Sequence, residues 1–276
     1  RLPGQAGAYL LTPEQAAAKI TAQLHEPVTE VHMVAGVWPK IPYSYYLELL
    51  RAVKAARPSI HIKAFTMVEL DQIAKSAKKP LREVLPELVA AGLGSSPGGG
   101  AEIFSERVRQ AGYRLKFSGD DWLATTREVH RAGLRSNCTM LHGHMETPEE
   151  RVDHLDRLRR LQDETGGFQV YIPLSFHPEN NEWSHFPGPS ALEELREIAV
   201  GRLMLDNIAH VKAYWIMLSI EVAQLALSYG ADDVDGTVVE EHIYHDAGAK
   251  TPQEVQRTEL VRWIVDAGRI PVERDT

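Results

Sequence analysis

The sequence predicts an α/β fold, a (β/α)8 barrel of the TIM type, and three observations lead to it. Short apolar runs of strand length alternate with amphipathic stretches of helix length. Strand–helix alternation with right-handed crossovers produces a parallel sheet. Several apolar runs also end abruptly in polar residues, as in "GGFQVYIPLSFHPENN" at residues 166–181. The carboxyl ends of barrel strands are where such enzymes place reactive side chains.

The composition is that of an ordinary globular protein, with 276 residues of which 43% are hydrophobic and 25% charged. We expect one domain over residues 1–276, because no linker-like stretch divides it. The net charge of −8 argues against a nucleic-acid surface. We expect no membrane partner, since no apolar run reaches spanning length and no signal peptide is present. The single cysteine, Cys138, fits the reducing cytoplasm.

Seven segments have the apolar character of strands: residues 30–35, 61–66, 101–104, 137–141, 169–174, 211–217 and 234–239. The amphipathic stretches between them include residues 44–57, 122–133 and 148–167. The last of these opens with Thr147 and Pro148 and closes with Gly166 and Gly167, which are good helix start and stop signals. Seven strands and a chain that starts without Met predict that the first barrel strand lies upstream of Arg1.

His142 and His144 stand two residues apart at the end of a predicted strand. Side chains at this spacing share a face, so both imidazoles could bind one metal ion, as in barrel hydrolases. The alternative is a packed histidine beside a helix-entry residue. Further ligands would have to come from other strand ends, and His177, His210 and Asp235 could be recruited. A metal-dependent hydrolase is therefore one candidate function.

Three consecutive glycines, Gly98–Gly100, precede the predicted strand that carries Glu102. Such a run lets the backbone approach a ligand closely, although a plain flexible connection is the alternative. It is not a Walker loop, and no predicted strand stands immediately before it, so it is not a dinucleotide fingerprint. Other strand-end polar residues are Thr66, Glu69, Lys212, Tyr214 and Asp235. The residues by themselves support a barrel enzyme of unspecified reaction.

Five segments, residues 1–15, 95–109, 139–181, 202–218 and 232–252, closely resemble the aminofutalosine (6-amino-6-deoxyfutalosine) synthase family. These are enzymes of the radical S-adenosylmethionine (SAM) superfamily in the futalosine route to menaquinone. The resemblance runs through the whole chain. The related cyclic dehypoxanthine futalosine synthase, an alternative function here, typically carries Gln where this sequence has His177 before Pro-Glu-Asn.

The resemblance implies a [4Fe–4S] cluster bound by three cysteines in a C-x-x-x-C-x-x-C motif just before the stretch that starts here at Arg1. We expect that motif upstream of the residues given, since Cys138 lies on a mid-barrel strand and cannot replace it. The alternatives are an inactive relative or a binding protein without a cluster. The implied reaction joins the 5′-deoxyadenosyl radical of SAM to 3-[(1-carboxyvinyl)oxy]benzoate, with reduced flavodoxin or ferredoxin as electron donor. SAM is consumed, which makes the enzyme a transferase.

The resemblance also implies roles for strand-end residues. The predicted catalytic residues are His177, His142 and Tyr214. The predicted substrate-binding residues are Asn180, Lys212 and Asp235. Contacts to SAM are expected from Ala35, Gly36, Thr66, Glu69, Glu102 and Ile172. No metal ligand is expected among residues 1–276.

Overall fold

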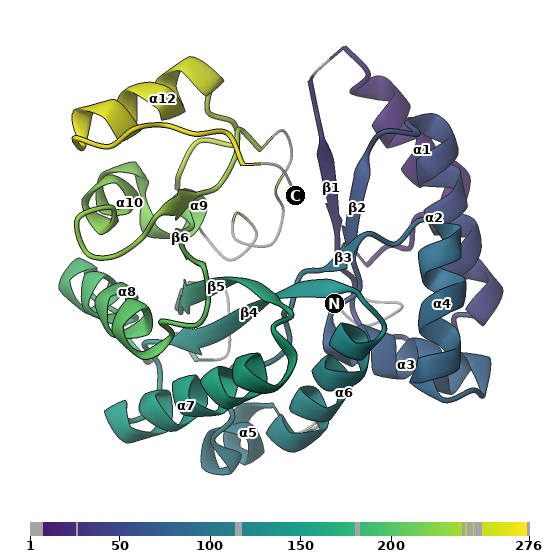
Figure 1. The fold of residues 1–276 in the computed structure, drawn as a ribbon, viewed down its shortest axis with the longest axis horizontal. Helices are drawn as coiled ribbons and strands as arrows, with labels where there is room; N and C mark the ends of the chain where they lie inside the picture. Colours follow the sequence, from purple (N-terminus) through teal and green to yellow (C-terminus); the bar gives the residue numbers. More distant parts are fainter. Residues whose placement is uncertain are drawn as a thin grey trace. The chain divides into compact units, whose positions relative to one another are not determined.

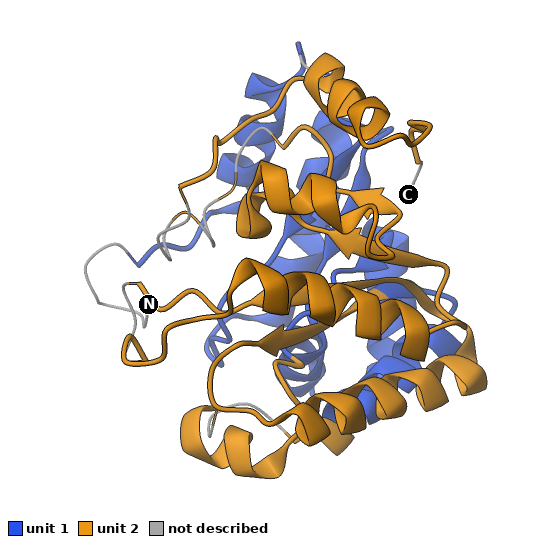
Figure 2. Cartoon of the chain, turned by 90° about the vertical axis from the view of Figure 1, so that its left-hand side faces the viewer, with its two compact units in different colours: residues 1–100, 121–136, 276 blue, residues 101–120, 137–275 orange. Residues whose placement is uncertain are grey.

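The computed structural model describes residues 8–25, 27–113, 118–179, 183–238, 241, 245 and 250–274. The chain divides into two compact units, coloured separately in Figure 2. Unit 1 comprises residues 1–100, 121–136 and 276, and unit 2 comprises residues 101–120 and 137–275. The organisation as a single domain stays a prediction.

The strands follow one another in the sheet in the same order as in the chain, from β1 to β7. Every register that the structure defines is parallel, from Glu30 opposite His61 in the first pair to Ala213 opposite Val234 in the last. Sequential parallel order with helical crossovers is barrel topology, as predicted. The strands are β1 (Glu30–Met33), β2 (His61–Ala64), β3 (Ser95–Ser96), β4 (Arg135–His142), β5 (Phe168–Ser175), β6 (His210–Ala213) and β7 (Asp233–Val234).

Helices fill the connections between strands, while α1 precedes β1 and α12 follows β7 (Figure 1). They are α1 (Pro13–Ala22), α2 (Tyr43–Ala56), α3 (Met67–Ala77), α4 (Leu81–Ala91), α5 (Glu106–Gly112), α6 (Gly119–Arg131), α7 (Pro148–Thr165), α8 (Ala191–Met204), α9 (Trp215–Leu218), α10 (Ile220–Ala226) and α12 (Arg257–Asp266). The predicted helices at residues 44–57, 122–133 and 148–167 are confirmed as α2, α6 and α7.

Helix α2 shows how the sequence pattern packs a helix within unit 1. It buries Tyr46, Leu49, Leu50 and Val53, which are spaced three and four residues apart and so form one apolar stripe. Helix α7 in unit 2 shows how a helix is delimited. Thr147 caps it in a reciprocal box with its third residue, and Gly166 ends it in the left-handed conformation.

The prediction of a strand at residues 101–104 is wrong. Glu102 has a φ of 49°, which no strand residue adopts. The carbonyls of Ala101 and Ile103 accept hydrogen bonds from the Arg109 guanidinium at 2.6 and 3.2 Å, so a side chain satisfies this backbone in place of a sheet. The strand is β3, directly ahead of the triple glycine, contrary to the expectation that no strand precedes it.

Four strands are shorter than predicted: β1 and β2 end at Met33 and Ala64, ahead of the predicted residues 35 and 66, and β6 and β7 are shorter as well. The apolar run at residues 211–217 leaves β6 at Ala213 and turns into α9. The prediction missed this change because a run buried on all sides has no periodicity that separates strand from helix. The Trp215 indole donates to the Gly236 carbonyl at 3.1 Å and holds this turn. Of the segment predicted at residues 234–239, Val234 belongs to β7, Val238 has a φ of 41°, and residue 239 lies outside the described residues.

No helix in the described ranges combines the length and the apolar character needed to cross a membrane.

Candidate active site

In unit 1, the segments that follow β1 and β2 meet at the side chain of Glu69. One carboxylate oxygen accepts the Ala35 amide at 3.0 Å. The other accepts the Thr66 amide at 2.9 Å and the Thr66 hydroxyl at 2.8 Å. Three predicted SAM residues are therefore brought together, and Gly36 follows next to them with nothing within 4 Å of the position a side chain would take.

Burial raises the pKa of Glu69 to about 7, even though the hydrogen bonds from Thr66 and Ala35 act in the opposite direction. The carboxyl is almost fully enclosed, with Glu69 6% exposed. Because both of its oxygens are occupied, Glu69 shapes the site and its contact to a ligand stays a prediction.

The triple glycine after β3 completes the strand ends of unit 1. A side-chain carbon at Gly100 would come within 2.6 Å of the Val68 side chain, and one at Gly99 within 3.2 Å of Thr66. The Trp122 indole donates to the Gly99 carbonyl at 3.2 Å and holds this loop in place. The loop thus lies close against the start of α3, and a role in binding SAM stays a prediction.

Glu102 belongs to unit 2. Its carbonyl accepts the Leu141 amide at 2.8 Å, which ties this irregular segment to β4. The left-handed backbone at Glu102 is a strained conformation for a residue with a side chain, and such residues concentrate at functional sites. Its role toward SAM stays a prediction.

Strand β5 of unit 2 presents Ile172 on the face opposite to its helices. The Tyr171 ring packs against Gly201 of α8, where an added side-chain carbon would lie 2.5 Å from the ring. Alternation along the strand then puts Val170, Ile172 and Leu174 on the other face. His177 follows this strand, and its Nε2 lies 3.2 Å from the Met217 carbonyl of α9.

Two predicted substrate residues, Lys212 and Asp235, form an ion pair of 2.6 Å between β6 and the segment after β7. Burial lowers the pKa of Lys212, but the carboxylates of Asp235 and Asp233 outweigh this, and the net shift is upward. Lys212 is therefore a buried cation at neutral pH. Tyr214, two residues after Lys212, occupies the N-cap position of α9. Asn180 lies outside the described residues.

His142 ends β4, and its side chain faces helices. Ser136, on the same face of the strand, pairs with His130 of α6 at 3.0 Å. Burial lowers the pKa of His142 to about 3, so the ring is neutral. Its Nδ1 finds no hydrogen-bond partner in the described part of the chain. The predicted catalytic role of His142 stays a prediction.

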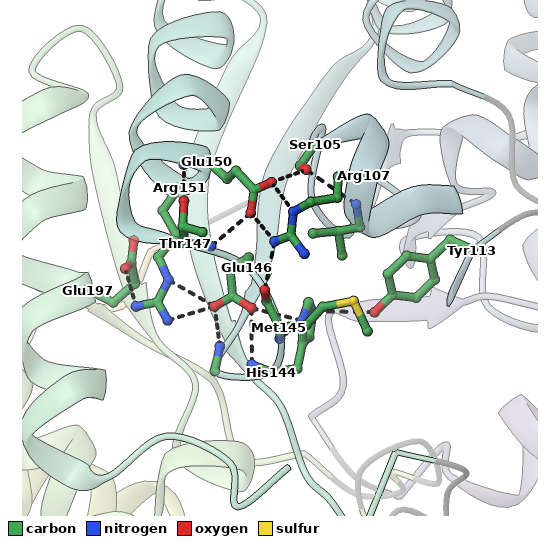
Figure 3. A network of polar contacts seen from close by, with 12 residues as sticks. Ser105, Arg107, Tyr113, His144, Met145, Glu146, Thr147, Glu150, Arg151 and Glu197 are labelled. Atoms are coloured by element: carbon green, nitrogen blue, oxygen red, sulfur yellow. Dashed lines mark hydrogen bonds and ion pairs between the residues drawn. The ribbon is translucent and has the colours of Figure 1, made fainter. Parts of the chain in front are cut away.

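His144 does not share the face of His142 by simple alternation, because Gly143 between them turns with a φ of 94°. Its Nδ1 lies 2.8 Å from a carboxylate oxygen of Glu146, and its Nε2 lies 3.4 Å from the Tyr113 hydroxyl (Figure 3). Both side chains of the His144–Glu146 pair are fully buried. In the described ranges, no three His, Cys, Asp or Glu side chains gather as a metal site.

Sequence reasoning did not single out Glu146, which organises the loop between β4 and α7 (Figure 3). It accepts the amides of Gly143 at 2.6 Å and His144 at 3.0 Å, and Arg151 at 2.7 Å. Burial alone would raise the pKa of Glu146, but the hydrogen bonds and the Arg151 charge outweigh it and lower the pKa to about 2. A carboxylate inside a strand-to-helix loop, just ahead of the capping Thr147, was the available signal.

The implied iron–sulfur cluster does not fit the residues of this chain. Cys138, the only cysteine, is fully buried in β4. Its thiol points to the Val170 carbonyl at 3.7 Å, and burial raises its pKa well above the usual value. A cluster ligand has to be a thiolate, so Cys138 is a packed core residue.

The solved structure of methylornithine synthase (PylB) has the same fold, with a TM-score of 0.71, 16% identity, and coverage of 98% of this chain and 76% of that one. The family model of the CofH/MqnC C-terminal region matches residues 165–276. An aminodeoxyfutalosine synthase of Thermus thermophilus is 49% identical over 276 residues, covering 99% of this chain and 74% of the relative. One from Streptomyces coelicolor is 44% identical over 287 residues, covering 100% and 74%.

Fold and relatives together define the chain as a barrel enzyme of the radical SAM class. The chain belongs to the aminodeoxyfutalosine synthase family. The resemblance inferred from the five sequence segments is confirmed.

Proposed function

We propose that the protein forms 6-amino-6-deoxyfutalosine from SAM and 3-[(1-carboxyvinyl)oxy]benzoate in the futalosine route to menaquinone, in the cytoplasm. The 5′-deoxyadenosyl radical adds to the enolpyruvyl double bond. Rearrangement onto the ring, loss of the carboxylate as CO2 or bicarbonate, and return of the remaining unpaired electron to the electron carrier complete the reaction. The observation that carries this proposal is the 49% identity to an aminodeoxyfutalosine synthase over 99% of the chain.

In this proposal a [4Fe–4S] cluster would supply the electron chemistry for SAM cleavage, with flavodoxin or ferredoxin as its reductant. We assign none of residues 1–276 as its ligand. The residues of this chain bind and orient the two substrates. The strand ends of unit 1, with Gly36 and the Gly98–Gly100 loop, are proposed to hold SAM.

Unit 2 supplies groups suited to an aryl substrate with two carboxylates. Lys212, kept protonated by Asp235, can donate to a carboxylate. His177 and Tyr214 are further donors at strand ends. The apolar face of β5 with Ile172 keeps water from a reactive radical, which must meet only its intended alkene. These roles are proposals that the variants below can separate.

The test uses protein from the complete reading frame, with its cluster reconstituted anaerobically and supplied with SAM, reductant and the enolpyruvyl benzoate. Mass spectrometry should find 6-amino-6-deoxyfutalosine only when all three are present. If 5′-deoxyadenosine forms without that product, the substrate assignment is wrong and the radical SAM assignment stands. A cyclised dehypoxanthine product from the related nucleoside would favour the cyclic dehypoxanthine futalosine synthase alternative. If neither product forms and the protein retains zinc, the hydrolase alternative is supported.

A further inference from the structure

The Glu69 carboxylate joins two chain segments with two separate oxygens. Its Oε2 completes the capping box at the start of α3, where it accepts the amide and hydroxyl of Thr66. Its Oε1 reaches across to the segment after β1 and accepts the Ala35 amide at 3.0 Å. The second bond spans 34 residues and has no part in capping the helix.

The chain's own helices show that capping alone does not require this carboxylate. Helix α1 has the same box with an amide in the third position, where Gln15 accepts the Thr12 amide at 2.8 Å. Helix α8 has it with an exposed carboxylate, where Glu193 accepts the Ser190 amide at 2.8 Å. A buried acid is costly unless it is satisfied, so the Glu69 carboxylate calls for a further reason.

The Ala35 bond supplies that reason. Residues 34–37 follow β1 at the surface, with Val34 39% and Val37 46% exposed and open space around Gly36. Beyond the strand ladder, Ala35 to Glu69 is the one hydrogen bond that the described part of the chain offers residues 34–37. Without it, no hydrogen bond from another described segment would hold the loop between β1 and Trp38.

We propose that Glu69 is a positioning residue that holds the loop at residues 34–37 in its ligand-binding conformation without touching the ligand. The inference rests on the proposed function for the identity of the ligand, SAM. Other hydrogen bonds hold the neighbouring strand ends. The Ser96 hydroxyl donates to the Phe65 carbonyl at 2.8 Å, and the Trp122 indole donates to the Gly99 carbonyl at 3.2 Å. Glu69 performs the same task for the segment after β1.

The variant Glu69→Gln tests this directly. Glutamine has one acceptor oxygen, so it can keep the box, as Gln15 does, but then turns its NH2 group toward the Ala35 N–H. Hydrogen–deuterium exchange on the ligand-free holoenzyme should show about tenfold faster exchange at residues 34–37, as expected for the loss of one charge-assisted bond. The matched control Glu193→Gln should leave exchange at residues 34–37 unchanged. Equal exchange in wild type and Glu69→Gln would overturn the inference.

SAM affinity gives the second readout, measured by equilibrium dialysis with the reconstituted protein. Glu69→Gln should weaken SAM binding about five- to tenfold, and Glu193→Gln should leave it within twofold. A looser loop with unchanged SAM affinity would overturn the link to the ligand. Failure of the wild type to bind SAM would overturn the proposed function, while the exchange result would still decide the role of Glu69 in the loop.

If Glu69→Gln does not fold, the wild type provides the test through pH. A protonated Glu69 loses one acceptor, and its pKa of about 7 places that change between pH 8 and pH 6. Tyr46 of α2 is the titratable side chain that acts on Glu69, and burial raises the pKa of Tyr46 to about 12, so it stays neutral. Exchange at residues 34–37, corrected for its intrinsic pH dependence, should rise from pH 8 to pH 6. A constant corrected rate would overturn the inference.

Discussion

The Lys212 ammonium lies 2.6 Å from an Asp235 carboxylate oxygen and joins strand β6 to the segment after β7. The lysine side chain is 10% exposed and the aspartate side chain 26%. This is a largely enclosed charge pair at strand ends, and Lys212 is the member proposed to bind a substrate carboxylate.

Lys212→Met should leave Asp235 as an enclosed carboxylate without its partner. We expect a loss of about 2 kcal/mol in unfolding free energy, less than for a fully buried pair because Asp235 is partly exposed. The matched control is Lys75→Met, which breaks an exposed pair of the same length, 2.6 Å, at a cost of about 0.5 kcal/mol or less. Chemical denaturation measures both, and equal losses would contradict the prediction.

Lys212→Arg keeps the charge and separates stability from substrate binding. If Lys212 binds a substrate carboxylate, Lys212→Met should raise the KM for the aryl substrate at least tenfold while SAM affinity is retained. Lys212→Arg should recover part of that loss. An unchanged KM in Lys212→Met would show that the pair is only structural.

Gly100→Ala should both destabilise the protein and weaken SAM binding. Gly100 has a φ of +84°, and an added side-chain carbon would lie 2.6 Å from Val68. Gly133 has the same φ of +84° with nothing within 4 Å, so Gly133→Ala isolates the backbone cost of about 1 kcal/mol. We expect Gly100→Ala to cost about 1–3 kcal/mol more by thermal unfolding. Similar costs would mean that Val68 moves aside.

Glu146→Gln should destabilise the loop between β4 and α7. The carboxylate is fully enclosed and satisfies Arg151, the His144 ring and two backbone amides, so its removal should cost about 3 kcal/mol. The control Glu150→Gln keeps its capping box with Thr147 and should cost about 1 kcal/mol or less.

The same carboxylate gives a predicted acid dependence. The folded-state pKa of Glu146, about 2, is below the ordinary value of 4.5, so its contribution is present above pH 4.5 and is lost as pH falls toward 2. Glu146→Gln should therefore flatten the acid limb of the stability curve. An unaltered acid limb would contradict the prediction.

For Glu194 we expect the opposite dependence of stability on pH, in a higher pH range. Burial raises its pKa to about 7, so the folded state binds more protons than the unfolded state between pH 4.5 and 7. Stability from this group falls as pH rises through that window. Glu194→Gln should match the wild type near pH 4 and exceed its melting temperature by a few degrees at pH 8. Glu193→Gln, next along the helix but exposed, should show no such gain.

Much of the fold was predictable because it depends on local patterns. Helix α7 has its cap and its proline at one end and its glycine at the other, and the helix begins and ends where these residues predict. Strands β4 and β5 also occupy the predicted runs, extended by one or two residues at each end. The strand prediction for residues 101–104 failed because Arg109, which lies outside this run, donates hydrogen bonds to its carbonyls.

The candidate site was predictable only as a set of strand ends. Lys212 and Asp235 were both named as substrate residues, and the structure pairs them. Glu146 was not predicted, because its role in organising the loop comes from contacts with Arg151 and His144 that no spacing rule reveals.

The sequence by itself determined the alternation of strands and helices, the family resemblance, and the polar residues that follow each strand. The tertiary structure alone decided which of those residues meet. The sequence predicted Glu69 as a strand-end residue that contacts SAM. Its bond to Ala35 exists because parallel pairing sets the end of β1 beside the end of β2. Local signals act within one turn of helix or one strand, whereas a site is made of contacts between residues far apart in the chain.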